Sequence, residues 1–218
     1  MGEGVLREIV EKDVDLGEIV RAVSQTAVAI PCYRRGPKLW RTLWSLNSTS
    51  PDVHVHVEEA ERCVAANRNA ALAKLDTRYV VMMDDDVLLP MLWLEKLMLV
   101  LLATPDAGIV GPKMTGMIGQ SQNGQSLLKV DEVMDCVMPG TLMLFDRERV
   151  TGCVFDEEYL GSQWEDTDFV MQVKAKGLST LVTGSVWILH DNEFTNGRGD
   201  NYVKNKARFK SKWTLPGV

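Results

Sequence analysis

The sequence has few of the features that build disulfide-rich, zinc-binding or nucleic-acid-binding proteins. Its four cysteines, among 218 residues, are widely scattered, and none forms a C-x-x-C pair. This spacing argues against a zinc knuckle and a disulfide framework, and we expect reduced thiols in a cytoplasmic protein. Acidic residues outnumber basic ones, 30 to 24, which gives a net charge of −6. We therefore expect no general nucleic-acid-binding surface.

A long apolar segment free of charge is also missing. The most hydrophobic stretch, residues 87–103, has Glu95 and Lys96 at its centre. Each charge would cost about 2.5–3.5 kcal/mol at the middle of a bilayer, so we predict a buried helix and no transmembrane span. The first twenty residues carry acidic side chains throughout, and we expect no secretory signal peptide. Peripheral contact with a membrane stays open.

Internal repeats and low-complexity tracts are absent, and the composition is that of a globular protein. With 45% hydrophobic and 25% charged residues, the chain suits a single α/β domain that buries its own core. We assign residues 26–218 to this domain and residues 1–25 to an N-terminal helical extension, with an amphipathic helix over 4–23. For the extension, packing against the domain and formation of a homodimer are both open.

Short apolar runs alternate with helical patterns after residue 25. In the first half we predict strands at 26–30, 53–57 and 78–83, and helices at 37–46, 62–75 and 90–103. This alternation is typical of parallel strands joined by crossover helices. The second half is more mixed, with strands predicted at 107–113, 136–146 and 179–191, a loop or hairpin at 117–130, and a helix at 164–177.

Polar residues follow the first three predicted strands. "PCYRR" comes after the first, Glu58 and Glu59 after the second, and Asp84 to Asp86 after the third. Ligands of open parallel sheets bind beyond these carboxyl ends, so we expect the three tips to meet at one crevice. Helix capping would explain only one of the three consecutive aspartates.

The three aspartates are costly unless a cation neutralises them. At about 5 Å and an effective dielectric constant of about 20, each pair of carboxylates repels by roughly 3 kcal/mol. On an extended chain Asp84 and Asp86 point to the same side, because side chains alternate with a period of two residues. Oxygen ligands of this kind suit Mg²⁺ or Mn²⁺. The pattern therefore predicts a divalent metal site.

Five short motifs occur in an order that suggests a family. They are "AVAIPCYRR", "ANRNAAL", "YVVMMDDDV", "WEDTDF" and "ILHD", each at a predicted strand end or helix start. From about residue 26 to about residue 213 the chain resembles family 2 glycosyltransferases of the GT-A fold. The resemblance implies an α/β, Rossmann-like GT-A fold: a mixed sheet flanked by helices in a single domain. It also implies metal-dependent sugar transfer from a nucleoside diphosphate to an acceptor hydroxyl.

The resemblance places the nucleotide sugar against the strand tips. Tyr33 would stack on the base, Glu58 stands where the family usually has a base-contacting aspartate, and Asp84 would bond to the ribose. "CY-Arg" replaces the usual "TY-Asn", which together with Glu58 leaves the base, of UDP or GDP type, open. The nucleotide-sugar-binding residues implied are Pro31, Cys32, Tyr33, Arg35, Glu58, Arg68, Asp84 and Asp85.

The resemblance also implies the metal ligands, the base and the acceptor site. Asp86 and His190 would hold the metal, and an imidazole among oxygens favours Mn²⁺ over Mg²⁺. Asp166 matches the general base of inverting members, and a helix N-terminus keeps such a carboxylate ionised. Asp168 is expected to be structural. Gly140, Trp164 and Glu165 would contact the acceptor, which could be a glycan, a lipid-linked sugar or a small molecule.

The C-terminal residues 191–218 have a predicted role, and two other functions stay open. Residues 191–218 combine a Gly/Asn segment with a run of lysine and arginine, and we expect a flexible lid over the diphosphate. A retaining enzyme on the same fold and a catalytically silent nucleotide- or carbohydrate-binding module both stay open. A nucleotidylyltransferase is disfavoured, because "IPCYRR" lacks a Gly-rich phosphate loop.

Overall fold

The described residues fold around one mixed β-sheet. The computed structural model describes residues 5–8, 14–115, 128–191 and 200–213; most of the loop or hairpin predicted at 117–130 lies outside them. In the described part, eight strands follow the order β1-β7-β9-β6-β8-β4-β2-β3, and β5 pairs with β9. The strands are β1 (Val5–Glu8), β2 (Thr26–Cys32), β3 (His54–Glu59), β4 (Tyr79–Met83), β5 (Val87–Leu88), β6 (Ala107–Thr115), β7 (Glu132–Asp135), β8 (Leu142–Asp146) and β9 (Ser179–His190).

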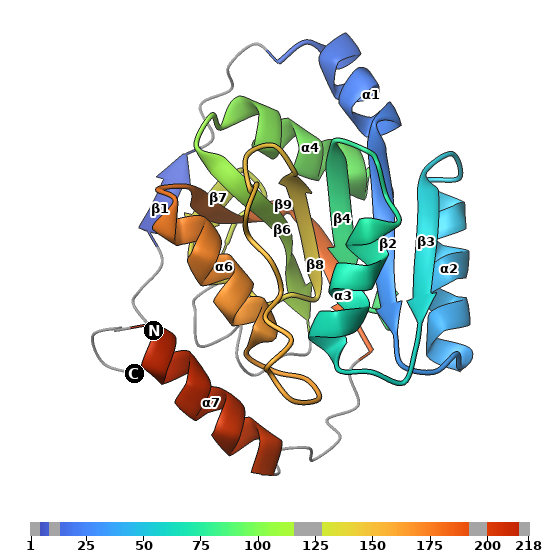
Figure 1. The fold of residues 1–218 in the computed structure, drawn as a ribbon. Helices are drawn as coiled ribbons and strands as arrows, with labels where there is room; N and C mark the ends of the chain where they lie inside the picture. Colours follow the sequence, from blue (N-terminus) through green and yellow to red (C-terminus); the bar gives the residue numbers. More distant parts are fainter. Residues whose placement is uncertain (1–4, 9–13, 116–127, 192–199, 214–218) are drawn as a thin grey trace.

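Helices cover both faces of this sheet (Figure 1). α3 and α6 pack with one face into a cluster that includes Phe169 and Val170. α1, α2 and α4 pack against the other face, where Trp93 of α4 is completely buried. The helices are α1 (Leu16–Ser24), α2 (Pro37–Thr49), α3 (Val64–Ala73), α4 (Trp93–Ala103), α6 (Glu165–Ala175) and α7 (Asp200–Lys212).

The first half of the chain confirms the parallel arrangement predicted from the sequence. β2 pairs in parallel with both β3 and β4, whereas β8 lies antiparallel to β4 and β6. Every residue of β2 and β4 is buried. Their continuous apolar runs follow from this position, because helices exclude water from both faces of these central strands.

The helix predicted over residues 4–23 is wrong in its first half. Val5–Glu8 is a strand that pairs antiparallel with β7, and the helix begins only at Leu16. β1 lies at the edge of the sheet, where its backbone groups bond to residues 132–135. That distant pairing, which no local pattern reveals, decides the conformation.

The predicted hydrophobic helix at 90–103 is confirmed as a buried element. α4 starts at Trp93 and buries seven of its eleven residues, while Lys96 is exposed and Glu95 half-buried. No helix in the described ranges has the length and apolar character needed to cross a bilayer.

Gly184, in the bulged part of β9, lies close to the backbone of a neighbouring segment. A Cβ atom on Gly184 would lie 1.7 Å from the carbonyl oxygen of Lys129. Because that oxygen belongs to the backbone, we expect Gly184→Ala to lower the free energy of unfolding by about 3 kcal/mol in urea denaturation. Gly36→Ala is the control, since its Cβ meets nothing within 4 Å, and it should cost less than about 1 kcal/mol. Equal stability of the two variants would contradict this packing.

Candidate active site

The acidic turn after β4 lies against the end of β9. Val87 of β5 pairs with His190, the last residue of β9, and the amide of Asp191 donates to the carbonyl oxygen of Asp86 at 2.8 Å. The amide of Asp84 donates to the carbonyl oxygen of Thr141 at 2.9 Å. Backbone pairing on both sides therefore fixes the turn that carries the three aspartates.

Asp84, Asp86 and His190 form one group. His190 Nε2 lies 2.9 Å from Asp86 Oδ1 and 4.0 Å from Asp84 Oδ2, and one ligand atom from each residue falls within 4.8 Å of the other two. Two carboxylates and one imidazole are a donor set that suits Mn²⁺. The residues therefore fit the metal implied by the resemblance, and Asp84, expected at the ribose, lies among the candidate ligands.

The charge on His190 fits the same interpretation. Burial alone would lower the pKa of His190, but the hydrogen bond to Asp86 and the negative charges of Asp86 and Asp84 raise it above its ordinary value. The protein without metal therefore favours a cationic imidazole between two carboxylates. Since a metal ligand must be a neutral imidazole, metal binding would displace that proton.

Asp85 points away from this group. Its carboxylate bonds to the thiol of Cys32, and burial raises the pKa of Asp85. Burial, together with the neighbouring Asp85, also raises the pKa of the Cys32 thiol to about 12. Asp85 and Asp86 lie in a turn and not on an extended strand, and the bond to Cys32 leaves Asp85 outside the metal-ligand group.

The tips of β2 and β3 hold the residues predicted to bind the base. Tyr33 follows β2 and is 58% exposed, while Pro31 pairs with Glu58 across the two strands. A hydrogen bond from His56, helped by Arg62, lowers the pKa of Glu58, so this carboxylate is ionised. An ionised, oriented carboxylate beside an exposed aromatic ring suits a nucleotide base that donates hydrogen bonds.

Arg35, predicted at the same nucleotide site, is engaged with β3. Its backbone amide and its Nε both donate to the carboxylate of Glu59, at 3.2 and 2.7 Å. The pair fixes the loop between β2 and α2. Binding of the nucleotide by Arg35 stays a prediction.

Arg68 connects the acidic turn to α6. This side chain of α3 is buried, and its two terminal nitrogens donate at 3.0 Å to Asp84 Oδ1 and to Glu165 Oε1. The sequence predicts contact with the nucleotide for Arg68 and with the acceptor for Glu165. Both side chains are buried and bind each other, because a buried charge is costly without its partner. Their contacts with the nucleotide and with the acceptor stay predictions.

Asp166 and Gly140 meet at the start of α6. The amide of Gly140 donates to Asp166 Oδ2 at 2.8 Å, and the amide of Thr167 donates to Oδ1 at 2.7 Å. A Cβ on Gly140 would lie 2.5 Å from the Cβ of Asp166 and 3.1 Å from both terminal nitrogens of Arg68. Only glycine therefore allows Asp166 to take this position beside Arg68.

Trp164 packs against the tail, and its predicted contact with the acceptor stays a prediction. Its ring lies 4.9 Å from that of Phe209 and 5.9 Å from that of Tyr202, both on α7. Trp164 and Gln163 have φ angles of 76° and 81°, which are strained for residues other than glycine. The side chain of Asn205 on α7 bonds to the backbone of Leu160, Ser162 and Gln163 and holds this turn.

The predicted lid contains this packed helix. Although burial alone raises the pKa of Asp156, hydrogen bonds from Lys212 and Arg208 lower it to about 2. Lys212 and Trp213 also donate to Asp168, which is fully buried, as its expected structural role requires. Part of the basic run thus binds acids of the same chain, and residues 192–199 of the predicted lid lie outside the described residues.

Sequence reasoning missed three residues beside the metal-ligand group. Lys38 donates to the carbonyl oxygen of Asp191 at 2.6 Å and lies 3.9 Å from Asp86 Oδ2. Arg41, one turn further along α2, forms an ion pair with the carboxylate of Asp191. The sequence does contain a signal for Lys38, because it is the second residue of the helix that follows the first strand tip.

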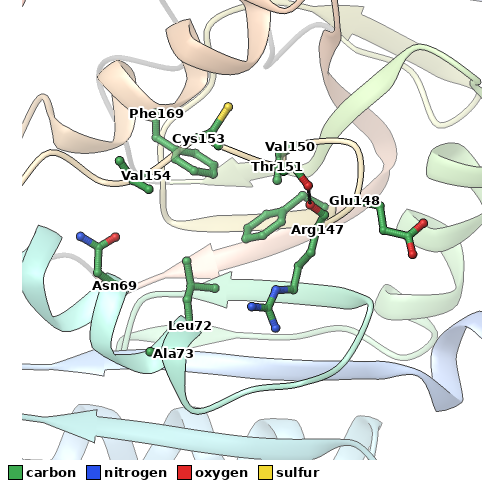
Figure 2. Close-up of a pocket in the computed structure, with 12 residues that line it drawn as sticks. Asn69, Leu72, Ala73, Arg147, Glu148, Val150, Thr151, Cys153, Val154 and Phe169 are labelled. Carbon is green, nitrogen blue, oxygen red and sulfur yellow. Dashed lines mark hydrogen bonds between the residues drawn. The ribbon is translucent and has the colours of Figure 1, made fainter.

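Figure 2 shows a pocket of about 500 Å³ at a different place. α3, Phe169 of α6 and the loop 147–154 line it. That loop follows Asp146, which pairs with Tyr79 at the start of β4, whereas Asp84 follows the end of β4. The pocket thus lies toward the opposite end of β4 from the metal-ligand group, and none of the predicted site residues lines it.

A comparison with protein-family models matches part of the chain. Residues 46–129, which include Arg68 and the three aspartates, match the model described as glycosyl transferase family 2. This stretch is therefore similar to glycosyl transferase family 2 domains. A comparison of the chain with curated proteins found no match.

Two solved structures show that the chain has the predicted GT-A fold. GalNAc-T7 with UDP, GalNAc and Mn²⁺ superposes with a TM-score of 0.67 at 13% identity, over 86% of this chain and 48% of that one. The mannosyltransferase PcManGT from Pyrobaculum calidifontis, in complex with GDP-Man and Mn²⁺, gives 0.63 at 17% identity, over 88% and 66%. The chain thus spans about half of one and 66% of the other.

The buried acids predict a pH dependence of stability. Burial, opposed in part by Arg68, raises the pKa of Glu165 from 4.5 to about 7. A raised pKa stabilises the fold below pH 4.5, and this contribution is lost as the pH rises to 7. Without metal, Glu165→Gln should therefore match the wild type near pH 4.5 and exceed its free energy of unfolding by about 2–3 kcal/mol at pH 8.

Urea unfolding at both pH values measures this difference. Glu148→Gln is the control, because the Glu148 side chain is 71% exposed, and it should leave the pH profile unchanged. A profile of Glu165→Gln parallel to that of the wild type would show that Glu165 titrates normally.

Proposed function

We propose that this protein is a metal-dependent glycosyltransferase that moves a sugar from a nucleoside diphosphate to an acceptor hydroxyl, with inversion. The observation that carries this proposal is the group of Asp84, Asp86 and His190, with ligand atoms within 4.8 Å of one another, at the edge of a GT-A sheet. The Mn²⁺ in both similar solved structures supports the choice of metal.

Asp86 and His190 are the proposed metal ligands. Asp84 is tied to Arg68 through Oδ1, which leaves Oδ2 for the metal or for the ribose. Mn²⁺, when bound, supplies a Lewis acid that stabilises negative charge on the departing diphosphate.

The donor base is proposed to lie at the tips of β2 and β3. Tyr33 offers an exposed ring for stacking, and Glu58 offers an ionised acceptor for base N–H groups. The two similar structures hold UDP in one case and GDP-Man in the other, so both remain donor classes for this chain.

Asp166 is the proposed general base. Two backbone amides, of Gly140 and Thr167, donate to its carboxylate and fix its orientation at the N-terminus of α6. A carboxylate held in a fixed orientation can take a proton from an acceptor hydroxyl. Direct displacement on the sugar then gives inversion. A glycan, a lipid-linked sugar and a small molecule all remain acceptor classes.

Metal binding tests the ligand assignment. We expect Asp86→Asn and His190→Ala each to weaken Mn²⁺ binding at least about tenfold in calorimetric titration, because each removes a direct ligand. Asp85→Asn is the matched control: it changes the middle aspartate of the same turn, whose carboxylate bonds to Cys32, and should leave the affinity within about twofold. Loss of affinity only in the control would reverse the assignment.

Turnover tests the reaction. The wild type should release nucleoside diphosphate from a nucleotide sugar in the presence of Mn²⁺, and Asp166→Asn should slow this about 10²–10⁴-fold without weakening donor binding. Product configuration, read by NMR, should be inverted. Full activity of Asp166→Asn with retained configuration would favour a retaining enzyme, whereas donor binding without any release would favour a silent binding module.

A further inference from the structure

A cation lies beside the metal-ligand group and has no part in the proposed reaction so far. Lys38 is the second residue of α2, and its ammonium is 3.9 Å from Asp86 Oδ2. The other oxygen of this carboxylate, Oδ1, is 2.9 Å from His190 Nε2. Asp86 therefore lies between a candidate metal ligand on one side and a lysine on the other.

The position of the ammonium is fixed by the end of β9. Lys38 donates to the carbonyl oxygen of Asp191, at 2.6 Å, and Arg41 pairs with the carboxylate of the same residue. Both contacts join the first turns of α2 to the residue that follows His190. The Lys38 side chain nevertheless keeps 32% of its surface exposed, so a ligand can reach it.

The ammonium retains hydrogen-bonding capacity. A lysine has three donors, and the carbonyl oxygen of Asp191 takes one. The 3.9 Å separation from Asp86 is an ion pair but is too long for a hydrogen bond. As far as the described residues go, two donors are therefore left for oxygen atoms of a ligand that binds next to Asp86.

Neighbouring cations are already bound to acids of the chain. Arg68 is buried between Asp84 and Glu165, and Arg35 is bound to Glu59. A diphosphate whose metal is held by Asp86 would place negative charge near the Lys38 ammonium, which is 3.9 Å from Asp86 Oδ2. A compact ammonium ion is a good partner for such oxygens.

We propose that Lys38 binds the diphosphate of the nucleotide-sugar donor and, by doing so, stabilises the leaving group. The inference rests on the proposed function, which supplies the diphosphate. Negative charge on the leaving group grows as the bond to the sugar breaks, and Lys38 is a fixed positive charge beside the place where it grows.

Calorimetric titration of nucleotides in saturating Mn²⁺ tests this assignment. The probes are UDP, GDP and the other common nucleoside diphosphates, together with the matching monophosphates. Lys38→Met should weaken binding of the preferred diphosphate about 10- to 100-fold and binding of its monophosphate less than about threefold, because only the diphosphate reaches the ammonium. Lys38→Arg, which keeps the charge, should restore part of the loss.

Binding of Mn²⁺ alone separates this role from a structural one. Lys38 repels a cation bound at Asp86, so Lys38→Met should bind Mn²⁺ equally well or more tightly, whereas damage to the site would weaken it. Lys176→Met is the matched control, because Lys176 also donates to a backbone oxygen, that of Thr151, outside the metal-ligand group. It should bind every probe as the wild type does.

Two results would overturn the inference and leave the proposed function intact. One is a Lys38→Met variant that binds the diphosphate as tightly as the wild type. The other is an equal loss for diphosphate and monophosphate. If the wild type itself binds no nucleoside diphosphate in Mn²⁺, the proposed function fails, and the inference about Lys38 fails with it.

Discussion

Arg68 carries a positive charge into the interior, and two distant parts of the chain depend on it. Its guanidinium binds Asp84 at the end of β4 and Glu165 at the start of α6, residues that are 81 positions apart in the sequence. A buried arginine without acids, or two buried acids without a cation, would cost several kcal/mol. The three charges therefore depend on one another, although burial still raises the pKa of Glu165 above its ordinary value. They join the strand end that carries the candidate metal ligands to the helix that carries Asp166.

Three consecutive aspartates have three different environments, because Asp85 and Asp86 lie in a turn and not on an extended strand. Asp84 binds Arg68, Asp85 binds the thiol of Cys32, and Asp86 lies between His190 and Lys38. The repulsion among the three carboxylates is thus divided between a guanidinium, a neutral donor, and a lysine together with an imidazole whose pKa is raised above its ordinary value. A divalent ion at Asp86 and His190 would take the neutral imidazole as its ligand.

The sequence predicted the parts of the fold that local pattern determines. The apolar runs of β2 and β4 follow from composition and period, because a central strand is apolar on both faces. The acidic turn at 84–86 is visible as three consecutive aspartates after an apolar strand. The pairing of Arg68 with Glu165 could not be predicted, since it joins residues 97 positions apart. The strand β1 was missed for the same reason, because only its partner β7 makes Val5–Glu8 extended.

The hydrogen bonds of Asn205 define how much of the chain forms one working unit. This buried side chain holds the strained turn at 160–164 that leads into α6 and Asp166, although it lies fifteen residues beyond His190. A fragment cut after the last strand would leave the backbone oxygens of that turn without their partner Asn205. A shortened or fused version of this protein should therefore keep α7 and Trp213, and an appended partner is best joined after them.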